Sequence, residues 1–207
     1  MVPFDYNDSP YPVRQGIKDA HRDYWQALAG PGTWFTGAER VAIAAEVRNA
    51  LNCSLCAERK EALSPCAVEG EHLSSSALDA RLVDAVHRVI SDQSRITQAF
   101  VDDNTAHGFT EEQYVELVGI AVTVLSIDEF NRALGLPLEP LPAPRSGEPS
   151  QYRPSQAVHG TGFVAMIPPD GANGSESDLW KNGNTANVLR ALTLVPNAMR
   201  EWLAPLD

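Results

Sequence analysis

The chain has 207 residues, 43% hydrophobic and 21% charged, a balance typical of one globular domain with a sizeable core. Its 16 basic and 27 acidic residues give a net charge of −11, which argues against nucleic acid and anionic membranes as partners, since both need a basic face. No signal-peptide pattern and no membrane-spanning apolar run is present, so we expect a soluble, cytoplasmic protein. Three cysteines are too few for a secreted disulfide scaffold.

Helical periodicity dominates the chain, which predicts an all-α fold. After an extended, proline-containing arm over 1–16, apolar residues recur at helical spacing between recognisable start and stop residues. The expected helices cover 17–28, 37–51, 53–63, 76–90, 93–107, 110–134, 185–194 and 196–203. Capping boxes mark the second of these helices at Thr36 and the longest at Thr110, while Asn52 and Asp92 are further expected N-caps.

The longest expected helix carries apolar residues on nearly every face, which predicts a central position in a bundle or an oligomer interface. Glu116 and Asp128 lie on this helix, where acids are costly unless they are paired or line a cavity. We expect them to form salt bridges with Arg40, Arg81 or Arg132.

Residues 137–178 are rich in Pro, Gly and Ser and predict neither helix nor sheet. We therefore expect a helical domain over 1–142 that includes the arm, a strap or linker over 143–184, and a C-terminal helical segment over 185–207. The strap is either disordered or lies across the surface, and one interpretation is that it covers the active site or binds a neighbouring subunit.

Cys53 and Cys56 are the residues from which a function can be inferred. Their spacing places both sulfurs on one helix face, and an N-cap at Asn52 would place them at the positive end of the helix dipole. That position stabilises a thiolate, and two neighbouring thiols can close into a disulfide after one is oxidised. The pattern favours a dithiol peroxidase or disulfide reductase over two cysteines that only pack in a core.

A zinc site is the second functional interpretation. Cys53, Cys56, Cys66 and His72 provide the ligand types of a structural Cys3His site. However, strong helix formers follow Cys56 directly, which disfavours the tight turn of a zinc knuckle, and we therefore expect no metal.

A thiol peroxidase needs a proton relay beside its cysteines. Glu46 lies two helical turns before Cys53 among apolar residues, so we expect burial to raise its pKa; the alternative is an exposed Glu46 paired with an arginine. Lys60, four residues after Cys56, is on the same face and can stabilise a thiolate. His72 and His87 are further candidate partners, without a positional argument for either.

The segment from Glu46 to Cys56 resembles the thiol motif of the AhpD-like, carboxymuconolactone decarboxylase superfamily, and residues 114–137 resemble its following long helix. The resemblance extends over about 17–142, and the segment 187–196 resembles a helix that opens such domains. It differs at the family histidine position, which is Lys60 here, and at the family glutamate position, where Val41 stands and Glu39 and Glu46 are the nearest acids.

The resemblance implies an AhpD-like helical bundle that works as a dimer or trimer. It implies a hydroperoxide reductase without a cofactor, in which Cys56 attacks the peroxide, Cys53 resolves the product, and a thiol reductant regenerates the pair. Glu46 or Glu39 would assist proton transfer, with Lys60 near the thiols. The alternatives are a dithiol reductase that has lost peroxidase activity, and a non-enzymatic helical oligomer with a structural or zinc-binding cysteine pair.

Overall fold

The computed structural model describes residues 3–74, 76–180, 183 and 185–203, apart from the side chains of Cys66 and Leu203. Within these residues the chain is helical, and its only β-type pairing is an isolated bridge between Val158 and Met166. The expected all-α fold is confirmed. No helix in the described part of the chain is both long enough and apolar enough to cross a membrane.

Helices α1 (Gln15–Ala29) and α2 (Gly37–Ala50) pack against each other at the start of the chain. The Thr36 side chain accepts the amide hydrogen of Glu39, whose carboxylate accepts the Thr36 amide hydrogen in return, so the expected capping box is confirmed. This pairing fixes Glu39 at the start of α2, whereas Glu46 lies near its end and is fully buried.

Helix α3 (Ser54–Glu61) and the 3-10 turn η1 (Pro65–Ala67) follow α2. The N-cap of α3 is Cys53 rather than the expected Asn52, and the Cys53 side chain makes no capping hydrogen bond. Both cysteines still lie in the first turn of α3, because Cys56 is the third helical residue. Both cysteines therefore lie at the N-terminal, positive end of the α3 dipole, with the N-cap one residue later than expected.

Helix α4 (Ala80–Ser91) has Asp79 as its N-cap and packs against α2, α3 and α6. The next expected helix is divided in the structure into the 3-10 turn η2 (Gln93–Arg95) and helix α5 (Gln98–Ala106). The division arises because Thr97, not Asp92, caps α5 by accepting the amide hydrogen of Phe100.

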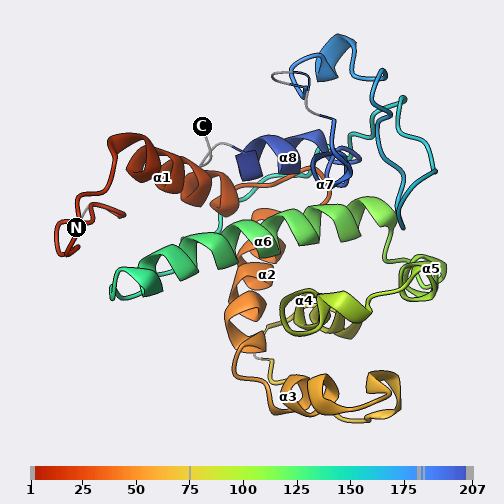
Figure 1. Ribbon diagram of the computed structural model, residues 1–207, viewed down its shortest axis with the longest axis horizontal. Coiled ribbons are helices and arrows are strands. Elements are labelled where there is room, and N and C mark those ends of the chain that lie inside the picture. The colour runs from red at the N-terminus through yellow and green to blue at the C-terminus, as the bar shows by residue number, and fades with distance from the viewer. Residues whose placement is uncertain (1–2, 75, 181–182, 184, 204–207) are drawn as a thin grey trace.

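Helix α6 (Glu111–Ala133) crosses the middle of the molecule, as its apolar character predicts, with α2 and α4 on one side and α8 on the other (Figure 1). Both of its buried acids are paired: Glu116 lies 3.5 Å from Arg40 and Asp128 lies 2.8 Å from Arg48. The salt-bridge interpretation was right, although Arg48 was not among the expected partners.

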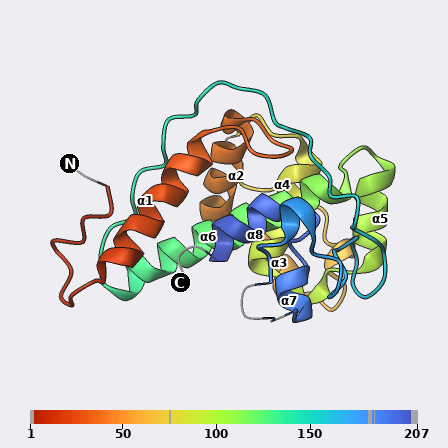
Figure 2. The same ribbon diagram turned by 90° about the horizontal axis from the view of Figure 1, so that it is seen from above.

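The chain after α6 runs past the connection between α1 and α2, as Figure 2 shows from above. There the amide of Arg145 donates to the Ala29 carbonyl and that of Gln151 donates to the Thr33 carbonyl, both at 2.7 Å. The 3-10 turn η3 (Gly174–Glu176), helix α7 (Asn187–Arg190) and helix α8 (Pro196–Leu203) complete the described chain.

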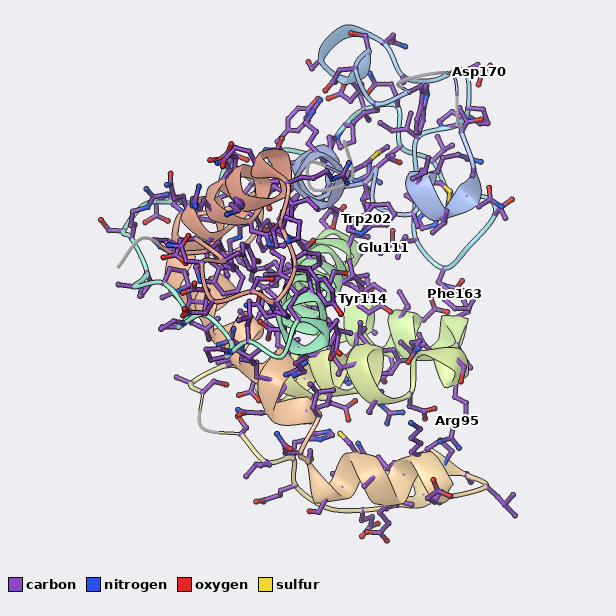
Figure 3. The ribbon with its side chains drawn as sticks, turned by 60° about the vertical axis from the view of Figure 1, so that its left-hand side comes forward. Arg95, Glu111, Tyr114, Phe163, Asp170 and Trp202 are labelled. Atoms are coloured by element: carbon purple, nitrogen blue, oxygen red, sulfur yellow. The ribbon has the colours of Figure 1, made fainter. Side chains whose placement is uncertain are left out.

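The strap and the C-terminal helices share a second cluster of buried apolar side chains, against which the labelled Tyr114 and Trp202 pack (Figure 3). The cysteines lie at the far end of α2 from the capping box and from these strap contacts. The described strap therefore does not cover the cysteine pair, contrary to one interpretation of the sequence.

Candidate functional site

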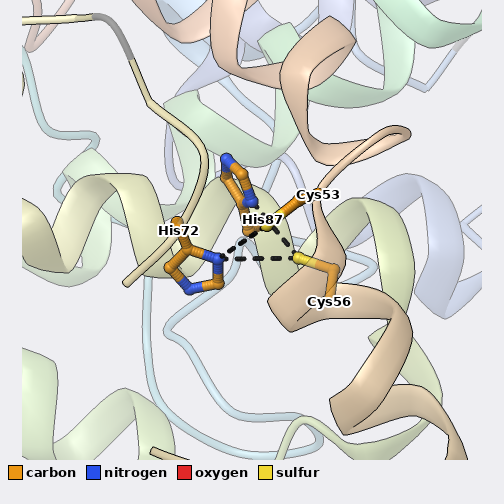
Figure 4. Close-up of side chains that lie close together, drawn as sticks. All are labelled: Cys53, Cys56, His72 and His87. Carbon is orange, nitrogen blue, oxygen red and sulfur yellow. Dashed lines mark hydrogen bonds between the residues drawn. The ribbon is translucent and has the colours of Figure 1, made fainter. Parts of the chain in front are cut away.

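Cys53 and Cys56 lie in a small buried cluster with two histidines (Figure 4). The Nδ1 atom of His87 is 3.2 Å from the Cys56 sulfur, and the Nδ1 atom of His72 is 3.6 Å from each sulfur. Both thiols are nearly inaccessible, with 3% and 4% exposure, and are not bonded to each other. The two sulfurs therefore share one imidazole, while Cys56 has a second imidazole of its own.

His87 connects Cys56 to Glu46. Its Nε2 atom lies 3.1 Å from a carboxylate oxygen of Glu46, and both side chains are completely buried. The other carboxylate oxygen of Glu46 accepts a hydrogen bond of 2.6 Å from Ser74. The result is a chain of contacts from a thiol through an imidazole to a carboxylate, the geometry in which a histidine moves protons for a nucleophile.

The pKa of Glu46 is lowered, not raised as its apolar sequence neighbours suggested. Burial alone raises it, but hydrogen bonds from Ser74, Ser76, His87 and Asn49 outweigh the effect of burial. Glu46 is therefore an ionised carboxylate near neutral pH. Its charge favours the protonated form of His87, whose pKa is raised because contacts with Cys56 and Glu46 outweigh its own burial.

His72 makes a second connection of the same kind. Its Nε2 atom is 2.9 Å from an Asp84 oxygen that also accepts a 2.7 Å hydrogen bond from Arg59. Burial lowers the pKa of His72, but contacts with Asp84, Cys56 and Cys53 raise it to about 10. His72 is thus a cation placed beside both sulfurs.

These cations favour the thiolate forms of the cysteines. Burial raises the pKa of Cys56, yet its contacts with His72 and His87 lower it to about 5. The pKa of Cys53 is also lowered: burial opposes the change, but the amides of Leu73 and Cys56 and the His72 ring stabilise its charge. A thiolate with these neighbours is a nucleophile or a metal ligand at neutral pH.

A short loop, residues 68–74, lies over the site, and we call it the cover loop. It supplies His72 and Ser74, and its Leu73 amide donates a 3.4 Å hydrogen bond to the Cys53 sulfur. Arg59 holds its start by donating to the Val68 carbonyl. The cover loop therefore shields the thiols from solvent and contributes to their chemistry.

Of the residues expected from the sequence, Cys53, Cys56 and Glu46 come together, but Lys60 does not. Its side chain is exposed on the last turn of α3, where Arg95 of η2 binds the carbonyls of Arg59, Lys60 and Ala62 (Figure 3). The cation of α3 that reaches the site is Arg59, which lies 3.1 Å from His72 Nε2 and donates a 2.7 Å hydrogen bond to Asp84. Glu39 is also excluded, because it belongs to the capping box of α2.

The two histidines were named as candidates from the sequence but without a reason to prefer them. His87 had a detectable signal: it lies four residues after the buried Val83 on the apolar face of α4. His72 had none, because it lies in a loop whose path depends on the packing of α3 and α4. Of the expected zinc ligands, Cys53, Cys56 and His72 converge, and the side chain of Cys66 lies outside the described residues.

Comparison with known proteins gives no match for this chain, whether with protein-family models, with curated proteins or with solved structures.

Proposed function

We propose that the protein is a dithiol oxidoreductase that reduces hydroperoxides through Cys56 and Cys53. The observation that carries this proposal is the buried contact chain in which His87 lies 3.2 Å from Cys56 and 3.1 Å from Glu46. A second cysteine three residues away provides a partner for disulfide formation. The sequence resemblance to the AhpD-like superfamily favours the same reaction and is part of this proposal.

In the first step the Cys56 thiolate attacks one oxygen of the peroxide and the O–O bond breaks. Cys56 becomes a sulfenic acid, and the departing alkoxide takes a proton from the His87 imidazolium to leave as an alcohol. Glu46 does not exchange protons in this step. As a buried carboxylate it stabilises the imidazolium before the step and orients the ring.

In the second step the Cys53 thiolate attacks the sulfur of the Cys56 sulfenic acid and a disulfide forms. The departing hydroxide takes a proton from the His72 imidazolium and leaves as water. His72, which lies 3.6 Å from both sulfurs, stabilises the Cys53 thiolate for this attack. An external dithiol then returns two electrons and two protons to the disulfide, so the proposed cycle needs a reductant partner but no cofactor. A reducing, cytoplasmic location fits this requirement and belongs to the proposal, as does assembly into dimers or trimers.

Substrate access requires movement of the cover loop, since both sulfurs are buried beneath it. It contains no α-helix, and its Leu73 side chain is 56% exposed. Segments with few buried apolar contacts open at low free-energy cost. We therefore assign access to a local opening of the cover loop rather than to a permanent channel.

Two serine variants test the proposal. Cys56→Ser should lower hydroperoxide reductase activity by a factor of about 10² or more, because it removes the nucleophile. Cys53→Ser should consume one equivalent of hydroperoxide and stop at a Cys56 sulfenic acid that dimedone traps. Ser54→Ala, an exposed position in the same helical turn, is the matched control and should keep wild-type turnover. Full activity in Cys56→Ser would refute the proposal.

A further inference from the structure

The four side chains of the site also converge in the manner of metal ligands. One donor atom from each of Cys53, Cys56, His72 and His87 can be chosen so that all four lie within 4.8 Å of one another. Both histidines turn Nδ1 toward the sulfurs, as the dashed contacts in Figure 4 show. Two thiolates and two imidazoles form the Cys2His2 donor set that Zn²⁺ prefers in tetrahedral sites.

The spacing of the donors fits a tetrahedral ion. With Zn–S bonds of about 2.3 Å and Zn–N bonds of about 2.0–2.1 Å, neighbouring sulfur and nitrogen ligands lie about 3.5 Å apart. Three of the four sulfur–nitrogen distances in the cluster are 3.6, 3.6 and 3.2 Å. The remaining donor pairs lie within 4.8 Å, so an ion can be accommodated between these atoms with side-chain shifts of about an ångström.

The groups behind the histidines also fit a metal site. The Nε2 atom of each ring contacts a carboxylate oxygen. The distance is 2.9 Å from His72 to Asp84 and 3.1 Å from His87 to Glu46. Asp84 is held in turn by Arg59 at 2.7 Å and Arg88 at 2.8 Å. A carboxylate behind each ligating histidine fixes the tautomer that exposes Nδ1 to the ion and increases its affinity.

We propose that the reduced protein binds one Zn²⁺ through Cys53, Cys56, His72 and His87, and that this metal blocks the thiols until peroxide oxidises them. Binding displaces the protons that remain on the four ligands. Oxidation then releases the metal. The two bound thiolates, one hydroperoxide and two protons yield the Cys53–Cys56 disulfide, an alcohol, water and free Zn²⁺. The metal site stands on geometry alone, whereas its regulatory role rests on the proposed hydroperoxide reduction.

The first test uses the reduced, metal-free, full-length chain and Co²⁺ as a spectroscopic probe. One equivalent should give the intense visible bands of tetrahedral cobalt together with a thiolate charge-transfer band, and Zn²⁺ should displace it stoichiometrically. His72→Asn should weaken Zn²⁺ binding at least 100-fold, and Asp84→Asn by about 10- to 100-fold. His159→Asn, an exposed histidine bound to Glu111, is the matched control. Octahedral spectra, or unchanged affinity in His72→Asn, would overturn the metal site.

The second test separates this inference from the proposed function. One equivalent of hydroperoxide added to the Zn²⁺-loaded protein should release the metal to a chromophoric chelator as the disulfide forms. Metal that stays bound after the disulfide has formed would overturn the switch. A protein that reduces peroxide but binds no zinc refutes this inference alone. A protein that binds zinc but reduces no peroxide in the metal-free form refutes the proposed function and the switch, and leaves a structural zinc site.

Discussion

At the scale of single residues, the site depends on two buried imidazoles that each connect sulfur to a carboxylate. His87 contacts the Cys56 sulfur, whereas His72 is equally distant from the Cys53 and Cys56 sulfurs. This asymmetry distinguishes the cysteines more clearly than their nearly equal burial does. It supports Cys56 as the attacking thiol and Cys53 as the resolving one.

The role of Glu46 gives a prediction about pH. Glu46→Gln removes the charge that stabilises protonated His87, so the Cys56 thiolate loses part of its electrostatic support. In the reduced, metal-free protein the apparent pKa of Cys56 should rise from about 5 by about 1, as followed by alkylation rate against pH. The Cys56 pKa rises because the variant weakens the cation that stabilises the thiolate and leaves the neutral thiol unaffected.

Glu58→Gln is the matched control for this experiment. It makes the same chemical change at an exposed position of α3 and should leave the Cys56 profile unchanged. If both variants give the wild-type profile, the stabilisation of the His87 imidazolium assigned to Glu46 is wrong.

Only some residues of this site could be predicted from the sequence. The Cys-x-x-Cys spacing and the apolar neighbours of Glu46 indicated a thiol site with a buried acid, and the structure places both cysteines and a fully buried Glu46 close together. The sign of the Glu46 pKa was wrong because it depends on hydrogen bonds from Ser74 and His87, which are distant in sequence. Lys60 lies four residues after Cys56, but its side chain is exposed, and the cation of α3 that contacts His72 and Asp84 is Arg59, whose partners are distant in sequence.

At the scale of elements, the cover loop links folding to reactivity. Gly70 adopts a φ of +155°, and a Cβ there would lie 2.9 Å from the Leu55 side chain. Gly70→Ala should therefore destabilise the closed loop by about 1 kcal/mol and increase the alkylation rate of Cys56 severalfold at pH 8.

Gly160→Ala provides the comparison, since a Cβ at Gly160 meets no atom within 4 Å. This variant should label at the wild-type rate. Equal labelling of Gly70→Ala and Gly160→Ala would show that the cover loop does not control access to the thiols.

Elements with strong local signals were predictable and those set by packing were not. The capping boxes at Thr36 and Thr110 located α2 and α6 to within a residue, because each is satisfied within one helical turn. The N-cap of α3 is Cys53 rather than Asn52, because Asn52 belongs to the hydrogen-bonded turn that ends α2 and Cys53 is the residue with an extended backbone. The helix expected from Asp92 was divided because Thr97 provides a second cap.

At the scale of the whole molecule, α6 is shared by two apolar clusters. One lies among α1, α2 and α4 and the other beneath the strap and α8. The thiol site belongs to a separate small cluster at the C-terminal end of α2, while the described strap contacts the chain next to the other end of that helix. The fold thus holds α2, α3 and α4 in the register that brings Glu46, Cys56 and His87 together.

The most direct test of the proposed dithiol cycle is peptide mapping of the reduced, metal-free protein after exposure to one equivalent of hydroperoxide. We predict one alcohol formed per chain and a single new disulfide between Cys53 and Cys56, with Cys66 still reduced. Recovery of both thiols with the peroxide unconsumed would contradict it, as would oxidation of Cys56 beyond sulfenic acid without disulfide formation.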